Sequence, residues 1–268
     1  MSDKPSYVLG ADEAEAARLD QQAAAIAPAT ALLLRAAGIG PGLRVLDLGT
    51  GPGHVAFLVA ELVGPEGSVL GIDQSETLLA IAESRRGGGN MAFEQGDART
   101  FRATEPFDAI VTRLLLFHLP DAVDVLRHHR QNLRPGGLMV ALDYDIGTAR
   151  AEPPVELAAT VLRWVEAGFR AAGAEPRIGA RLGPLLRAAG YEDVAGFGVQ
   201  GYLQPDARPE RLLAGVARSL APQILASGIA TEEELGLDTL DARLAEAVAA
   251  EGSVVLPPCV AGAWAVRS

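Results

Sequence analysis

Residues 45–53 read VLDLGTGPG, and this stretch decides how the chain folds. Its first half is an apolar run of the length of a buried strand, and its second half carries Gly49, Gly51 and Gly53. The apolar stretch 55–63 follows at once, so the segment predicts a strand, a tight turn and a helix. Glycines let such a turn pass close to a ligand, and the amides that open the helix face whatever lies over the turn.

The same order of strand and helix recurs on the C-terminal side of this segment. Short apolar runs at the right spacing predict further strands at 68–73, 91–97, 107–112 and 138–142. A helix is expected at about 121–133, followed by a turn at 134–137. Strands that alternate with helices in this way predict an α/β fold, with a mostly parallel sheet and helices on both of its faces.

The remaining segments predict helices around this core. Residues 11–37 are rich in Ala, Leu, Glu and Gln and predict a helical segment with a break at Pro28. A helix at 153–172 has no strand directly after it, and 205–251 form a second helical stretch. Within that stretch Thr231 and Glu234 have the spacing of a capping box.

The expected organisation is therefore one elaborated domain. An N-terminal helical cover occupies 1–40, and the core occupies 41–268 with helical insertions at about 150–175 and 203–252. We expect the two insertions to form a lid. The apolar end, 254–264, is expected to be the last strand.

Two carboxylates follow the next two predicted strands. Asp73 lies about twenty residues after the glycine turn, where a carboxylate can accept hydrogen bonds from both hydroxyls of a ribose. A glycine turn with Asp73 alone also fits a nicotinamide or flavin dinucleotide. Asp97, in the order Gly96-Asp97-Ala98, can accept a hydrogen bond from an adenine amino group. Because Asp97 has no evident role in a dinucleotide-binding protein, and the turn is Gly-x-Gly-x-Gly rather than Gly-x-Gly-x-x-Gly, that protein class is the less favoured alternative.

Together these features resemble the class I S-adenosylmethionine-dependent methyltransferase family. Asp47, the three glycines, Asp73 and Asp97 fall in the order and spacing of that family, and the segments LFHLPD at 116–121 and RPGG at 134–137 resemble two more of its motifs. The most similar group includes ubiquinone and menaquinone C-methyltransferases and natural-product methyltransferases. The resemblance implies a Rossmann-like, seven-stranded, mostly parallel sheet with its last strand antiparallel, and S-adenosyl-L-methionine as cofactor.

The resemblance also implies which residues surround that cofactor. The glycine turn would approach its methionine part, Asp73 the ribose, and Asp97 with Ala98 the adenine. Arg113 and Leu114 would border it from the end of the fourth strand, and in related enzymes the N-terminal segment folds over it. The expected cofactor-binding residues are Tyr7, Gln22, Asp47, Gly49, Thr50, Gly51, Gly53, Asp73, Gln74, Asp97, Ala98, Arg113 and Leu114.

Few residues are candidates for catalysis, because the cofactor's sulfonium supplies the electrophile and the protein mainly aligns the acceptor and removes a proton. His118 follows the fourth strand, where the family's acceptor faces the cofactor, and a histidine packed at the start of a helix is the alternative. Asp143 and Tyr144 end the fifth strand, and capping of a helix or loop is the alternative for Asp143. His128 and His129 are expected to be solvated on the polar side of a helix.

The amino-acid composition limits the kinds of partner and ligand that the sequence predicts. The net charge of −11 over 268 residues disfavours a nucleic-acid partner, because such binding depends on Lys and Arg that displace counterions. The four histidines lack the spacing of a metal site, and Cys259, the single cysteine, has no thiol to pair with. Without a long apolar run or a signal peptide at the start, a cytoplasmic protein with no membrane partner is expected.

We therefore expect methyl transfer to a small, apolar or aromatic acceptor, such as a secondary metabolite or a quinone-like ring. Oxygen, nitrogen and carbon all remain open as the atom that is methylated. An enzyme of the same fold that binds the cofactor for a different reaction is the nearest alternative. The oligomeric state is open, and a homo-oligomer is compatible with the sequence.

Overall fold

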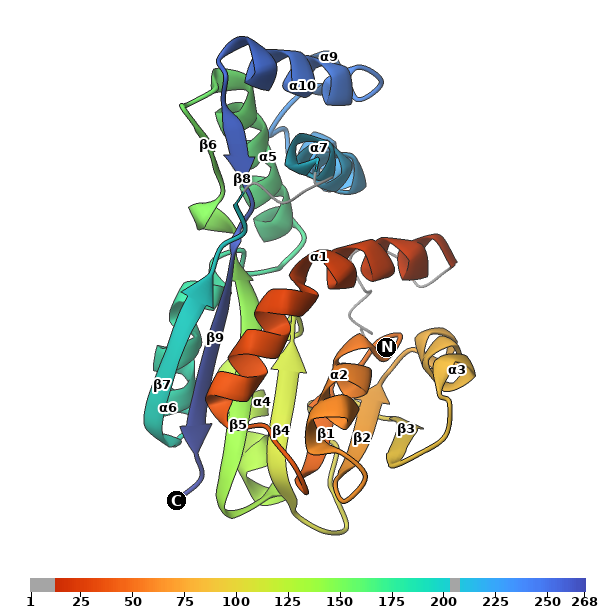
Figure 1. Cartoon of the computed structure of the whole chain (residues 1–268). Coiled ribbons are helices and arrows are strands. Elements are labelled where there is room, and N and C mark those ends of the chain that lie inside the picture. Colours follow the sequence, from red (N-terminus) through yellow and green to blue (C-terminus); the bar gives the residue numbers. More distant parts are fainter. Residues whose placement is uncertain (1–12, 203–207) are drawn as a thin grey trace. The chain divides into compact units, whose positions relative to one another are not determined.

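A computed structural model of the chain describes residues 13–202 and 208–268, with side chains from residue 19 onward (Figure 1). By its internal contacts the chain separates into two compact units. The first runs up to Asp143 and adds 181–197 and 261–268, whereas the second comprises 144–180 and 198–260. The glycine turn lies in the first unit.

A seven-stranded sheet forms the centre of the first unit, with the strand order β3-β2-β1-β4-β5-β9-β7. The strands β1 to β5 are parallel to their neighbours within that group. Arg267 exchanges backbone hydrogen bonds of 2.8 Å with Gly136 and Gly137, which places the end of β9 beside the start of β5, so β9 is antiparallel. The predicted Rossmann-like sheet is confirmed. Its strands are β1 (Arg44–Leu48), β2 (Ser68–Asp73), β3 (Met91–Gln95), β4 (Phe107–Arg113), β5 (Leu133–Asp145), β7 (Glu192–Val199) and β9 (Cys259–Val266).

Helices cover both faces of this sheet. In Figure 1, α1 and α2, which contact each other, lie in front of the sheet, and α4 and α6, which also contact each other, lie behind it. Each face buries fully enclosed leucines, such as Leu33 from α1 and Leu126 from α4, and each such side chain contributes about 1.5–3 kcal/mol. No helix described here is long and apolar enough to cross a lipid bilayer. The helices are α1 (Glu13–Ala37), α2 (His54–Val63), α3 (Glu76–Arg85), α4 (Ala122–His129) and α6 (Leu182–Ala188), with 3-10 turns η1 (Leu116–His118) and η2 (Arg130–Asn132).

The second unit is mainly helical and has its own core. The helix α5 packs against α7 and α8, and α7 packs against α10. The predicted capping box is confirmed, because the Thr231 hydroxyl accepts from the Glu234 amide while the Glu234 carboxylate accepts from the Thr231 amide. The elements are η3 (Ile146–Thr148), β6 (Arg150–Glu152), α5 (Glu156–Ala171), η4 (Ile178–Arg181), α7 (Pro209–Ser219), α8 (Ala221–Ala226), α9 (Glu232–Leu235), α10 (Leu240–Ala250) and β8 (Val254–Leu256).

Two expectations about the ends of elements were wrong. The apolar end is not one strand, because Pro257 and Pro258 lack amide hydrogens and interrupt the pairing; β8 pairs antiparallel with β6, and β9 joins the large sheet. The N-terminal helix does not break at Pro28 but continues through it. Burial of Ile26 and Leu33 on either side of the proline offsets the roughly 3 kcal/mol that a proline costs inside a helix.

The turn expected at 134–137 and the solvation of His129 were also corrected by the structure. Leu133 is in register with Phe107 of β4, and Gly136 and Gly137 are paired with Arg267, so β5 runs through the expected turn. His129 is fully buried, because the last turn of α4 faces the loop that follows β3. A helical polar face that is covered by a loop cannot be distinguished from a solvated one by its spacing alone.

The glycine turn passes very close to β2. A Cβ atom on Gly71, in the middle of that strand, would lie 2.7 Å from the Thr50 hydroxyl and 2.8 Å from the Phe93 ring. Real Cβ atoms essentially never approach other atoms so closely. The turn can therefore lie where it does only because residue 71 has no side chain.

We expect Gly71→Ala to lower the free energy of unfolding by about 1–3 kcal/mol, the usual cost of inserting a methyl group into a packed interior. Gly87→Ala is the matched control, because a Cβ on Gly87 would meet no atom within 4 Å. Urea denaturation of both variants measures the difference. Equal stability of the two variants would show that the approach is not tight.

Candidate active site

The predicted cofactor residues come together because they follow parallel strands that end at one edge of the sheet. Leu48, the last residue of β1, is in register with Ile72 of β2 and Thr112 of β4. Asp73, the last residue of β2, is in register with Gln95 of β3. The glycine turn and the residues that follow β2, β3 and β4 are thus placed side by side.

The glycine turn has the backbone that its glycines allow. Gly49, Gly51 and Gly53 have φ values of 70°, 53° and 89°, in the left-handed region that other residues seldom adopt. The amides of Gly49 and Thr50 both donate to the carbonyl oxygen of Ile72, at 2.9 Å each. These two bonds hold the start of the turn on the end of β2.

The three glycines differ in what surrounds them. A Cβ on Gly49 would lie 3.0 Å from the Leu115 side chain, and one on Gly53 would lie 2.7 Å from the Phe57 ring. A Cβ on Gly51 would meet no described atom within 4 Å. Packing of the protein therefore accounts for the outer glycines, whereas the middle one borders open space.

Asp47 lies beneath the turn and is 1% exposed. Its carboxylate accepts a hydrogen bond of 2.7 Å from the Thr50 hydroxyl and another from the Ala56 amide. Burial raises the pKa of Asp47 to about 6, although the hydrogen bond from Thr50 and the positive charge of Arg113 oppose the shift. Asp47 thus supports the turn from inside, and a direct contact with the cofactor stays a prediction.

Asp73 and Asp97 are half-buried, and backbone amides fix both carboxylates. The two oxygens of Asp73 accept from the amides of Gly51 and Ser75, each at 2.9 Å. One oxygen of Asp97 accepts from the Arg99 amide at 2.8 Å. Because each carboxylate oxygen has two lone pairs, both groups keep the capacity to accept hydrogen bonds from a ligand.

The end of β4 combines backbone strain with a positive charge. Leu114 has φ 56°, which is uncommon for a residue with a side chain and is often found at functional sites. Its amide donates to the carbonyl oxygen of Leu142 at 2.9 Å, which holds it in this conformation. The half-buried Arg113 donates to the Thr30 hydroxyl of α1 at 3.2 Å. Both residues lie at the edge where the sequence predicts the cofactor.

Fewer contacts place the other predicted cofactor residues at this edge of the sheet. Ala98 is buried and directly follows Asp97, whereas Gln74 has an exposed side chain. Gln22 is half-buried on α1, and Tyr7 lies outside the described residues. The roles of Gln22 and Gln74 stay predictions.

A polar cluster that the sequence did not predict anchors α1 beside the turn. Asp20 of α1 accepts from both terminal nitrogens of Arg85 at 2.8 Å, and its carboxylate lies 2.7 Å from His54 Nε2. The Arg85 guanidinium lowers the pKa of Asp20, and burial lowers the pKa of His54. His54 directly follows Gly53, which could have drawn attention to it, but nothing in the sequence links it to partners 34 and 31 positions away.

His118 and Asp143 come close together in the first unit. His118 is half-buried in η1, and its ring packs edge-on against Phe117 with 5.0 Å between centroids. Asp143 is 1% exposed, and its carboxylate accepts from the Phe117 amide at 3.1 Å. Asp143 therefore holds the segment that carries His118, and its part in proton transfer stays a prediction.

Tyr144, the third catalytic candidate, begins the second unit and is half-buried. Its neighbour Asp145 is buried and lies 3.4 Å from the Arg177 guanidinium. Burial, with the negative charge of Asp145, raises the pKa of the Cys259 thiol. Asp145 thus has an ion pair with Arg177 of the same unit.

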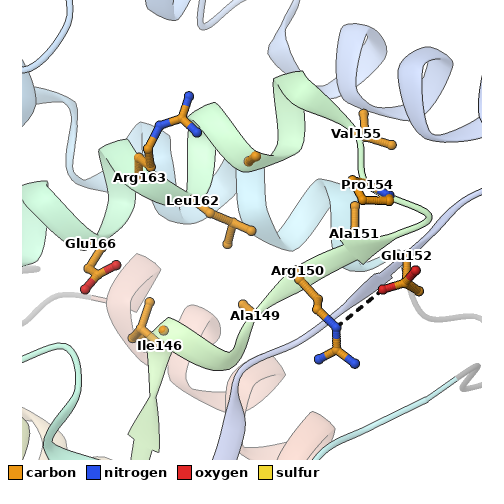
Figure 2. A pocket seen from close by; sticks show the side chains of 12 residues that line it. Ile146, Ala149, Arg150, Ala151, Glu152, Pro154, Val155, Leu162, Arg163 and Glu166 are labelled. Atoms are coloured by element: carbon orange, nitrogen blue, oxygen red, sulfur yellow. Dashed lines mark ion pairs between the residues drawn. The ribbon is translucent and has the colours of Figure 1, made fainter.

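The second unit contains a groove of about 370 Å³ between β6 and α5 (Figure 2). Its charged side chains already have partners: Arg150 lies 3.7 Å from Glu152, Arg163 lies 3.3 Å from Glu156, and Glu166 binds an arginine one turn further along α5. These charged side chains thus take part in ion pairs within the second unit. The lining residues are Ile146, Gly147, Ala149, Arg150, Ala151, Glu152, Pro154, Val155, Ala159, Leu162, Arg163 and Glu166.

The comparison with known protein families shows to which family the chain belongs. The family described as "Methyltransferase domain" matches residues 39–184, which is more than half of the chain. The chain belongs to this methyltransferase family. Among the described residues, no group of three or more His, Cys, Asp or Glu side chains is arranged to hold a metal ion.

Three relatives show the range of the methyltransferases to which the chain is similar. A trans-aconitate 2-methyltransferase from Methylobacterium radiotolerans is 33% identical over 62% of this chain and 61% of its own length. A nocamycin O-methyltransferase from Saccharothrix syringae is 32% identical over 58% of this chain and 61% of its own. A demethylmenaquinone methyltransferase from Geobacillus kaustophilus is 34% identical over 41% of this chain and 49% of its own. The chain spans 37% of the length of a second trans-aconitate 2-methyltransferase, from Streptomyces avermitilis.

A solved structure supports the fold of the methyltransferase. Phosphoethanolamine N-methyltransferase 2 of Haemonchus contortus, in complex with phosphomonomethylethanolamine and S-adenosylhomocysteine, has a TM-score of 0.55 and 17% identity, over 89% of this chain and 52% of its own. S-Adenosylmethionine is the cofactor of such methyltransferases. The residues at the strand ends fit it, because the space beside Gly51 is open and the carboxylates of Asp73 and Asp97 follow the next two strands along the sheet with lone pairs to spare.

The buried carboxylate of Asp47 predicts a pH dependence of stability. Because its pKa is raised to about 6 in the folded state, the unfolded chain releases the proton first as the pH rises. The stability that this group contributes is present below pH 4 and is lost between about pH 4 and 6, by about 3 kcal/mol.

Asp47→Asn should remove this dependence while keeping an acceptor for the Thr50 hydroxyl. Urea denaturation of both proteins at several pH values between 4 and 7 measures the effect. The variant should gain stability relative to the wild type as the pH rises, and a constant difference would contradict the raised pKa.

Proposed function

We propose that the protein transfers the methyl group of S-adenosylmethionine to a small organic acceptor. The observation that carries the proposal is the open space beside Gly51, with half-buried carboxylates following β2 and β3 at the same edge of the sheet. Their backbone partners hold both carboxylates in position before a ligand arrives. A site that is formed in advance loses less conformational entropy on binding.

Each part of the site has a task in this proposal. Asp73 accepts hydrogen bonds from the ribose hydroxyls, and Asp97 accepts one from the adenine amino group. Gly51 leaves room for the methionine part, and Arg113 and Leu114 border the cofactor from the end of β4. When bound, the cofactor supplies an electrophilic methyl group on its sulfonium, so the protein needs to exclude water, orient the acceptor and take up a proton.

The acceptor is proposed to be apolar or aromatic, like a secondary metabolite or a quinone-like ring. Relatives named for nocamycin and demethylmenaquinone support this choice, and the net charge of −11 makes a nucleic acid a poor partner. The relative named for trans-aconitate makes a small carboxylic acid the rival class to be assayed beside it. Formation of S-adenosylhomocysteine with each class identifies the acceptor and separates methyl transfer from another reaction of the same cofactor.

The helical segments outside the sheet are proposed to close the site around the cofactor and the acceptor. Residues 1–40 cover the cofactor, and the insertions at about 150–175 and 203–252 act as a lid over the acceptor. Slower hydrogen exchange in α5, α7 and α10 when S-adenosylhomocysteine and an acceptor are added would support the lid. Exchange that stays the same would make these helices permanent packing.

Substitution at Gly51 tests the cofactor site directly. Gly51→Ala and Gly42→Ala both place a side chain at a positive φ, and a Cβ on either would meet no protein atom within 4 Å. Only the first places a methyl group in the proposed cofactor space, so we expect it to raise the Kd for S-adenosylhomocysteine at least about tenfold, or 1.4 kcal/mol.

Isothermal calorimetry on both variants measures this effect. Equal affinities in the two variants would remove the turn from the site. A wild-type protein that does not bind S-adenosylhomocysteine would contradict the proposed function itself.

His118 is proposed to take the proton from the acceptor. His118→Ala should lower kcat by about 10²–10⁴-fold and leave the affinity for S-adenosylhomocysteine nearly unchanged. Since an imidazole must be neutral to accept a proton, wild-type activity should fall at acid pH, and the variant should lack this fall. A variant with full turnover and the wild-type pH profile would show that the acceptor needs no base here.

A further inference from the structure

The loop that follows β3 is held from behind by a buried histidine and a buried asparagine. His129, the last residue of α4, is 0% exposed, and its Nε2 lies 2.7 Å from the carbonyl oxygen of Ala98. Asn132 in η2 is 2% exposed, and its side-chain amide lies 2.9 Å from His129 Nδ1. Both side chains come from a segment about 30 positions further along the chain.

Hydrogen bonding decides the protonation state of His129. A carbonyl oxygen can only accept, so Nε2 must carry the hydrogen, and Nδ1 must then accept from the Asn132 amide. The same Asn132 nitrogen also donates to Phe101 O at 3.0 Å, and its Oδ1 accepts from the Ala103 amide at 3.0 Å. Burial lowers the pKa of His129 to about 4, which agrees with a neutral ring whose two nitrogens are both engaged.

These bonds bear on Asp97 because the loop is short and held at several points. The backbone carbonyl of Asp97 accepts from the amides of Thr100 and Phe101, at 3.0 and 2.8 Å. The Asp97 carboxylate accepts from the Arg99 amide. The bond from His129 to Ala98 holds the residue next to Asp97. A shift of Ala98 would therefore move the carboxylate that is proposed to face the adenine amino group.

We propose that neutral His129 is a positioning residue for adenine recognition, which acts through the Ala98 carbonyl on the carboxylate of Asp97. The inference rests on the proposed function, since it presumes that Asp97 accepts from the adenine amino group. It predicts that His129 affects the choice of base more than the binding of the rest of the cofactor.

Two ligands that differ only in the base separate this role from a structural one. S-Adenosylhomocysteine carries the amino group, and S-inosylhomocysteine has an oxo group in its place. His129→Leu removes the donor to Ala98, whereas His129→Gln can still offer an N–H near the position of Nε2. The matched control is Tyr191→Phe, which removes a different buried hydrogen bond to the same helix, from the Tyr191 hydroxyl to Leu126 O at 2.9 Å.

Calorimetry with both ligands gives the expected pattern. The wild type should prefer the adenosyl ligand, and His129→Leu should lose at least tenfold of that preference, mainly through weaker binding of the adenosyl ligand. His129→Gln and Tyr191→Phe should keep the preference, even if Tyr191→Phe unfolds at a lower temperature. Full preference in His129→Leu, or equal weakening of both ligands, would overturn the proposal.

A second variant keeps the test decisive if His129→Leu does not fold. His129→Phe is this variant, because it keeps an aromatic ring in the buried position and removes the donor to Ala98 O. The preference for the adenosyl ligand should fall as in His129→Leu, and an unchanged preference would overturn the proposal. A wild-type protein that binds neither ligand would contradict the proposed function. Wild-type binding with an unchanged preference in the variants would contradict only the role of His129.

Discussion

The close passage of the glycine turn over the ends of β1 and β2 is the constraint on which the rest of the site depends. It requires a residue without a side chain at Gly71, and it places the buried carboxylate of Asp47 under the turn, where Thr50 and Ala56 donate to it. A buried carboxylate is costly, as its raised pKa shows, and it persists because these donors satisfy it. Once the turn is fixed, α2 must begin at its end, and Gly51 faces the open space.

Long-range polar contacts hold the two sides of this edge. On one side, Asp20 of α1 joins His54, the first residue of α2, to Arg85 at the end of α3. On the other side, His129 and Asn132 hold the loop after β3. His129 and Asn132 are buried, and breaking their hydrogen bonds would leave a costly unpaired group, so this pair stiffens the loop. The site thus owes its shape to side chains that touch no ligand in the proposed scheme.

The site offers few side chains that could act as a general acid or a general base. The carboxylate of Asp143 already accepts from the Phe117 amide, and Asp145 has an ion pair with Arg177, so neither acid is without a structural task. This leaves His118 and Tyr144 as the predicted candidates for proton removal. Such economy suits a reaction in which the cofactor brings a reactive methyl group and the protein mainly aligns the acceptor.

The sequence by itself determined the central strands of the sheet and which residues follow them at the edge of the proposed cofactor site. The run at 45–53, with Asp73 and Asp97 at the following strand ends, sufficed because each pattern is local: strand length, glycine spacing and the residue after a strand are written in consecutive positions. Only the tertiary structure decided that α1 continues through Pro28, that β8 leaves the large sheet, and that His129 is a buried neutral ring. Each of these depends on which distant element packs against the residue, and the energy of that contact exceeds any preference of the local sequence.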